Sequence, residues 1–134
     1  MSISAAAAAK QIVVVVGAGP GLGFSVARKF AEQGHPVALL SRSKERLETL
    51  ASQINGLSGG TGRAVAYAVD VQDEASVNTT IQQVQDHFAS GKAGAEHQGA
   101  FIHTGVFNPG GGFVRAPFLD TKASQVEDAF KTQV

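Results

Sequence analysis

The chain has 134 residues, of which 43% are hydrophobic and 16% are charged, a composition typical of one ordinary globular domain. Its 11 basic and 11 acidic residues balance, so no overall charge points to nucleic acid or an anionic membrane as a partner. The absence of cysteine excludes disulfides and thiolate metal sites, and it suits a reducing, cytoplasmic location. Residues 1–10, MSISAAAAAK, are expected to form a flexible lead-in, because a short isolated helix is only marginally stable in water.

Residues 11–134 predict a single domain in which strands alternate with helices. The first strand, Ile12–Val16, is continuously apolar, as expected for a parallel sheet covered on both faces, and it is far too short to cross a bilayer. A helix is predicted over Leu22–Gln33, where apolar residues recur at helical spacing, and Gly34 is a natural stop after it. Val37–Leu40 is predicted as the second strand.

The same alternation continues through the rest of the chain. Ser43 is placed to cap a second helix, and Ala64–Val69 is predicted as the third strand. A third helix ends near Ser90, Ala100–Thr104 is a fourth strand, and a glycine- and proline-rich loop leads to a last helix from Lys122 to Val134. The apolar stripes of the second and third helices comprise Leu47, Leu50 and Ile54, and Val77, Ile81, Val84 and Phe88. This order predicts a truncated, doubly wound parallel sheet of the Rossmann type, with about four strands and helices on both faces.

Four glycines lie between the first strand and the first helix, in the stretch VGAGPGLG. Gly17 would permit a tight turn, while Gly19 and Gly21 would leave room for a pyrophosphate. Gly23 would let the helix pack closely against the strand. The free N–H groups and the dipole of a helix beginning at Leu22 attract phosphate. A strand before the glycines and a helix after them favour a dinucleotide-binding turn over a merely flexible loop.

The spacing of Gly17, Gly21 and Gly23 follows G-x-x-x-G-x-G. It resembles the short-chain dehydrogenase/reductase family, whose turn reads T-G-x-x-x-G-[IL]-G. The resemblance continues in VALLSRSKERLETLA, in AVDVQDEASV and in GGFVRAPFLDTKASQVEDAFKTQV, and it covers Lys10 to Val134. It implies the N-terminal, nucleotide-binding half of an oxidoreductase.

Two positions depart from the family pattern. Val16 replaces the threonine before the first glycine, which removes a hydroxyl that would help to fix the turn. The family's N-N-A-G after the fourth strand is assigned to IHTG, Ile102 to Gly105, where both asparagine amides are missing. Thr104 and Gly105 are then the residues expected to let the backbone approach a cofactor.

The resemblance also bears on which nucleotide is bound. Family members that prefer NAD carry an acidic residue near the position of Ser41, which binds the adenosine ribose. Here a neutral Ser41 is followed by Arg42, and Lys44 and Arg46 are close by. A guanidinium can bind a 2′-phosphate through two parallel hydrogen bonds, and Ser41 and Ser43 can donate further ones. NADP(H) is therefore expected, the alternative being that Arg42 points into solvent.

Asp70 follows the predicted third strand. It matches the family's aspartate that accepts a hydrogen bond from the adenine amino group, with Val71 contributing its backbone. The alternative is a turn or helix-capping aspartate, since Asp73 lies just beyond.

The residues with which the family reduces a carbonyl have no counterpart here. The family uses a serine and a Tyr-x-x-x-Lys pair after the fifth strand, whereas the only tyrosine, Tyr67, lies in the third strand and is followed four residues later by Val71. Gln133 falls near the family's active-site asparagine, as a weak substitute or without a role. No catalytic residue is assigned.

The histidines show no metal-ligand spacing, and no metal is expected; they are His35, His87, His97 and His103. His103, at the end of the fourth strand, is the one candidate acid. It is interpreted as structural because nothing beside it would orient or activate it.

Two hypotheses follow. The first is an NADP(H)-binding oxidoreductase represented by its cofactor-binding half, and the second is a non-catalytic nucleotide-binding or interaction protein derived from the same family. A flavodoxin-like domain is disfavoured because its phosphate loop is usually rich in hydroxyl groups. The fourth strand would form an edge without charge, proline or bulge, so a homo-oligomer or a separate C-terminal half is the expected partner besides the nicotinamide dinucleotide.

Overall fold

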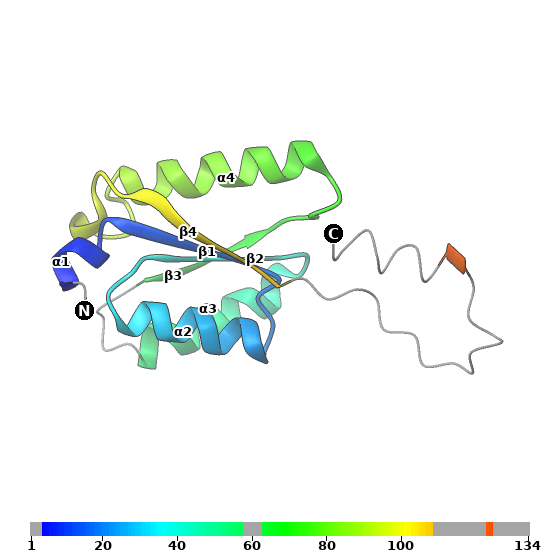
Figure 1. Ribbon diagram of the computed structural model, residues 1–134, viewed down its shortest axis with the longest axis horizontal. Coiled ribbons are helices and arrows are strands. Elements are labelled where there is room, and N and C mark those ends of the chain that lie inside the picture. Colours follow the sequence, from blue (N-terminus) through cyan, green and yellow to red (C-terminus); the bar gives the residue numbers. More distant parts are fainter. Residues whose placement is uncertain (1–3, 58–62, 109–122, 125–134) are drawn as a thin grey trace.

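The computed structural model describes residues 4–57, 63–108 and 123–124. These residues contain a four-stranded parallel sheet in the order β3-β2-β1-β4 (Figure 1). The strands are β1 (Gln11–Val16), β2 (Val37–Ser41), β3 (Ala64–Ala68) and β4 (Phe101–Phe107). The helices are α1 (Ala5–Ala8), α2 (Leu22–Glu32), α3 (Lys44–Leu57) and α4 (Glu74–Ala89), with a short 3-10 turn, η1, at Ala95–His97. The predicted Rossmann-type sheet is confirmed, while most of the predicted last helix, with Gln133, lies outside the described residues.

The strand β1 lies between two hydrophobic cores and contributes side chains to both. Helices α2 and α3 cover one face of the sheet and α4 covers the other (Figure 1). Val13 and Val15 contribute to the core beneath α2 and α3, whereas Ile12 and Val14 contribute to the core beneath α4. Successive side chains of a strand point to opposite faces, so a strand covered on both sides needs an unbroken apolar run.

The N-terminal segment is held more closely than a flexible lead-in would be. Ala8 and Ala9 are buried, although they precede the first strand. The ring of His97 bonds through Nδ1 to the carbonyl oxygen of Ala9 at 2.8 Å. The Lys10 carbonyl accepts from the N–H of Phe101, and Lys10 Nζ donates to the Gln98 carbonyl. The end of the lead-in is therefore fixed to the segment that enters β4.

The strand β4 continues beyond the predicted end at Thr104. Gly105, Val106 and Phe107 pair with the last three residues of β1. The register also shifts: Ile12 is level with Ile102 but Val13 is level with Thr104, so His103 is an extra residue in β4. The expectation of an edge without a bulge was wrong. The extra residue rotates the strand, and Val106 packs on the α2–α3 side while Ile102 packs on the α4 side.

At the beginning of each outer strand of the described sheet, one carboxamide side chain forms two hydrogen bonds with the strand's backbone. Asn55 of α3 donates to the Ala64 carbonyl at 3.1 Å and accepts from the Ala64 N–H at 2.7 Å. Gln85 of α4 donates to the Ala100 carbonyl at 2.8 Å and accepts from the Ile102 N–H at 3.1 Å. Each amide thus takes the place of a neighbouring strand for one step of the ladder. We refer to the two as the carboxamide brackets.

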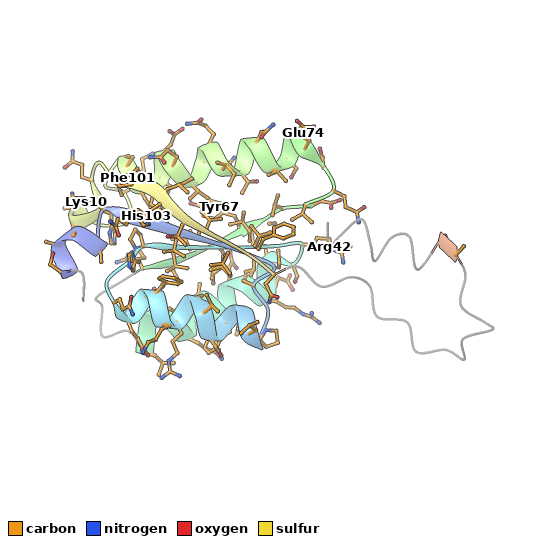
Figure 2. The ribbon with its side chains drawn as sticks, viewed as in Figure 1. Lys10, Arg42, Tyr67, Glu74, Phe101 and His103 are labelled. Atoms are coloured by element: carbon orange, nitrogen blue, oxygen red, sulfur yellow. The ribbon has the colours of Figure 1, made fainter. Side chains whose placement is uncertain are left out.

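Tyr67 is a strand residue that packs against the core beneath α4 (Figure 2). Its hydroxyl is buried and has no hydrogen-bond partner among the described residues. Burial raises the pKa of Tyr67 from 10.0 to about 12.

The variant Tyr67→Phe tests this environment. It removes a hydroxyl without a partner, so we expect the melting temperature at neutral pH to stay the same or rise. In the wild type the unfolded chain loses the tyrosine proton before the folded chain does, so stability is lost as pH rises from 10 toward about 12. Thermal unfolding followed by circular dichroism across this range should show a smaller loss for the variant. A lower melting temperature of the variant at neutral pH would mean that the hydroxyl has a partner.

Candidate functional site

A cleft of about 380 Å³ lies where β1 and β2 end. Ligands of open parallel sheets bind at this carboxyl edge of the strands. The cleft is lined by Gly17, Ala18, Gly19, Pro20, Ser41, Arg42, Ser43, Arg46, Leu50, Val69 and Val71. Part of this lining is predicted from the sequence. Arg46 is predicted there only as a nearby cation, and Leu50 only as a core residue.

The turn after β1 is fixed through the neighbouring strand. The N–H groups of Gly17 and Ala18 both donate to the Leu40 carbonyl, at 2.8 and 3.3 Å. Gly17 has a φ of 81°, a conformation that side chains with a Cβ rarely adopt. Val16, which replaces the family's threonine, packs against the core beneath α4 instead of helping to hold the turn. Backbone bonds to β2 therefore supply the anchoring that a hydroxyl would have given.

The other glycines of the turn have two different surroundings. A Cβ added to Gly23 would lie 2.9 Å from the Ala18 Cα and from the Gly17 carbonyl oxygen, so α2 can approach β1 only with glycine there. A Cβ on Gly19 or Gly21 would meet nothing within 4 Å. The space over these two residues is open, and it adjoins the first turn of α2. There the Phe24 N–H donates to the Gly19 carbonyl at 3.0 Å, while the N–H groups of Leu22 and Gly23 have no partner within the helix.

The wall opposite the glycine turn is cationic. Ser41 is the half-buried last residue of β2, and its Oγ accepts from the Ser43 N–H at 3.4 Å. Arg42 and Arg46 are exposed, line the cleft and form no ion pair with a described residue. Arg42 lies at the end of the sheet away from Lys10 (Figure 2). No carboxylate of a described residue lines the cleft, so the field of these arginines attracts anions.

Asp70 makes the turn contact that was named as its alternative role. Its Oδ1 accepts from the Gln72 N–H at 3.0 Å, while Asp73 caps α4 by accepting from Ala75 and Ser76. Val71 lines the cleft and Asp70 does not. The adenine contact of Asp70 therefore stays a prediction.

Thr104 and Gly105 do not lie at the carboxyl end of the fourth strand. They pair with Val13 and Val14 inside the sheet, because β4 continues to Phe107. The residue that follows the strand is Asn108, whose N–H donates to the Val16 carbonyl at 2.8 Å, directly before the glycine turn. The assignment of the family's N-N-A-G to IHTG rested on a strand that was ended too early. The described residue after β4 is Asn108, which opens the stretch NPGG of the sequence.

The histidines do not enter the cleft. His35 is buried and bonds through Nδ1 to the Gln11 carbonyl at 2.9 Å, and His97 is bonded to Ala9 in the same way. His103 is exposed and contacts Thr104 Oγ1 at 2.8 Å. Within the part of the chain that the structure describes, no three histidine, aspartate or glutamate side chains gather so that they could hold a metal ion. No helix within 4–57 or 63–108 is both long and apolar enough to cross a membrane.

A family model described as short chain dehydrogenase matches residues 11–133. An uncharacterized oxidoreductase of Mycobacterium bovis is 34% identical over 74 residues, which cover 55% of this chain and 22% of that protein. The meso-2,3-butanediol dehydrogenase of Serratia marcescens is 29% identical over 101 residues, which cover 72% of this chain and 38% of that protein. The chain thus spans well under half the length of these curated relatives.

Solved structures of short-chain dehydrogenases resemble this chain over a larger part of its length. A short-chain dehydrogenase from Rhodopseudomonas palustris superposes with a TM-score of 0.68 at 27% identity, over 92% of this chain and 50% of that one. A metagenomic short-chain oxidoreductase in complex with NADP superposes with a TM-score of 0.70 at 25% identity, over 98% of this chain and 51% of that one. The chain therefore has the fold of about half of each of these proteins.

Because Gly23 and Gly21 have different surroundings, substitution by alanine should lower the stability of the protein by different amounts at the two positions. Gly23→Ala places a methyl group against backbone atoms at 2.9 Å, and we expect a loss of stability of about 1–3 kcal/mol. Gly21→Ala is the matched control, since its methyl group meets nothing, and only the cost of alanine at a helix N-cap, about 0.5–1 kcal/mol, should be lost. Urea unfolding of both variants gives the two values. Equal losses would contradict the close packing of α2 on the turn.

Proposed function

The chain belongs to the short-chain dehydrogenase family, and on that premise we propose that it is the cofactor-binding part of an NADP(H)-dependent oxidoreductase. The observation that carries the proposal is the cleft beside the glycine turn: among the described residues, its wall has two guanidinium groups without an ion-pair partner and no carboxylate. The solved short-chain oxidoreductase in complex with NADP supports the choice of cofactor by its likeness to this chain.

The residues present fit the pyrophosphate of such a cofactor. The open space over Gly19 and Gly21 is where a side chain would stand in the way. The N–H groups at the start of α2 would donate to the phosphate oxygens, and the positive end of the helix dipole adds attraction. Leu22, which follows and is 66% exposed, would cover the bound molecule with an apolar side chain.

The residues that follow β2 would select the 2′-phosphate. Arg42 and Arg46 can approach it from one side as charged donors, and Ser41 and Ser43 can donate from shorter side chains. An acidic residue at Ser41 would bind the ribose hydroxyls of NAD and repel the phosphate. Leu50, Val69 and Val71 form an apolar wall suited to the flat adenine, and Asp70 is proposed to accept from its amino group.

The nicotinamide end is proposed to lie beside Asn108 instead of Thr104 and Gly105. Asn108 is held next to Val16 by its backbone bond, so its position relative to the glycine turn is fixed. When bound, the nicotinamide supplies or accepts a hydride. The described residues bind and orient the cofactor, and we assign no proton donor among them. A non-catalytic nucleotide-binding protein is the alternative, and no observation favours it.

The exposed edge of β4 is the proposed contact surface for further protein. Phe101 and Phe107 are 50% and 58% exposed on this strand, which pairs with β1 alone among the described strands. Large exposed apolar side chains beside unpaired backbone invite a further strand. We propose that a second copy of the chain or a separate C-terminal half covers this edge, and that residues 11–134 act as one domain in the cytoplasm.

Cofactor preference can be measured directly. We expect NADPH to bind more tightly than NADH, and Arg42→Ala to weaken NADPH by about 1.5–3 kcal/mol, roughly ten- to a hundred-fold, with little effect on NADH. Arg46→Ala should act in the same direction. Fluorescence titration of both nucleotides gives the affinities, and Lys29→Ala on α2 is the control for loss of one positive charge. Equal affinity of the wild type for both nucleotides would refute the assignment of NADP(H).

Occupation of the glycine turn has its own test. Gly21→Val should abolish binding of both nucleotides, because the side chain fills the space proposed for the pyrophosphate. The circular dichroism spectrum should stay that of the wild type, which separates this effect from unfolding. Retained binding would place the phosphates elsewhere.

Association through β4 predicts a mass that depends on concentration. Light scattering over a dilution series should show species larger than the monomer, and Phe107→Lys should shift them toward the monomer. Phe107 is preferred to Ile102 as the site of the change, since Ile102 packs in the core beneath α4. A wild type that stays monomeric at high concentration would refute self-association, and the separate C-terminal half would then have to be tested by co-expression.

A further inference from the structure

A second cleft runs along the outer edge of β3, where it lies between α3 and the end of α4. Its volume is about 600 Å³, and the β3 residues that line it are Ala64, Val65 and Ala66. It shares no lining residue with the cleft beside the glycine turn. Nothing in the proposed cofactor binding uses it.

The charged groups around this β3 groove are mainly cationic. Arg63 precedes β3 and Lys92 follows α4; both are exposed and neither forms an ion pair with a described residue. Lys44 lines the groove further along, and its partner Glu48 is the one acidic residue among the described residues of the lining. That pair is 4.0 Å apart with both side chains over 60% exposed, so solvent screens it and it leaves much of the charge of Lys44 free.

His87 reports on the potential inside the groove. Its pKa is lowered by burial first, and then by the positive charges of Lys92 and Arg63. Both cations therefore act on the same ring, and both line the groove beside it. No carboxylate is among the causes of this shift, so an anion in the groove would meet attraction from both cations.

The edge of β3 is less suited to an added peptide strand than to a small ligand. Asn55 already occupies the N–H and the carbonyl of Ala64, the first step of the edge. The bracket leaves only the part of β3 beyond Ala64, a short stretch that ends at Ala68, for a peptide to pair with. The volume of the groove lies in the range of small-molecule sites, about 300–1,000 Å³.

We propose that the β3 groove is a second anion site, which binds a small molecule carrying two or more phosphate groups between Arg63 and Lys92. Arginine and lysine are the side chains that bind phosphate most strongly, arginine through two parallel hydrogen bonds. His87 adds a ring nitrogen at the same place, and it takes up a proton more readily once an anion is bound. Lys44 would meet the more distant phosphate of a longer ligand.

The test uses inorganic pyrophosphate as the probe and residue-resolved NMR as the readout. Titration of the 15N-labelled chain should shift the amides of Arg63 and Lys92, whatever happens at Gly17–Gly23, so the result does not depend on the cofactor site. The pKa of His87, followed through its ring protons, should rise on binding. The double variant Arg63→Ala/Lys92→Ala should weaken binding at the groove by about tenfold or more.

The control is Arg28→Ala/Lys29→Ala, which removes two positive charges from α2 on exposed positions outside the groove. It should leave binding at the groove unchanged. The absence of shifts at Arg63 and Lys92, or equal weakening by both double variants, would overturn the proposal. An acidic peptide that shifts the amides of Ala66 and Ala68 and binds more tightly than pyrophosphate would also overturn it, in favour of strand addition.

Discussion

The position of β1 is the constraint on which the rest of the molecule depends. The strand is covered on both faces, is paired on both sides, and is held at its start by two buried histidines that bond to the carbonyls of Ala9 and Gln11. At its other end the backbone of Gly17 and Ala18 is fixed to Leu40. A turn tied to so rigid a strand can present its open side to a ligand without first being ordered, so less of the binding free energy is lost to ordering.

The architecture was predictable because local patterns and burial agree in most of the chain. Ile12–Val16 could only be a strand buried on both faces, and the helical stripe with Leu47 and Ile54 packs where its spacing indicates. The roles of Gly17 and Gly23 also followed from their spacing, since a tight turn and a close helix contact tolerate few other residues. In these cases each residue is fixed by its immediate neighbours along the chain.

The end of β4 was not predictable in the same way. Gly105 interrupts the apolar pattern, which predicts the start of a loop. It nevertheless pairs with Val14, because β1 extends beside it. The bulge at His103 likewise arises from the pairing and leaves no local signal. With the strand expected to end at Thr104, the cofactor contact was expected at Thr104 and Gly105, which lie inside the sheet. The place of Arg46 in the cleft was not predictable for a related reason, since it depends on how α3 packs on the sheet. Nothing in the local pattern indicates that His35 and His97 are buried and bond to backbone carbonyls.

The carboxamide brackets make the two ends of each outer strand differ in whether their backbone groups can pair with a further strand. At β4, Gln85 closes the step between Ala100 and Ile102, while the outer side of the strand beyond the bulge has no backbone partner among the described residues. At β3, Asn55 closes the first step in the same way. An incoming strand can therefore start only toward the end of the sheet that carries the glycine turn, and it stops where the amide side chain stands. Two uncharged side chains thus limit how far along each outer strand a further strand could pair.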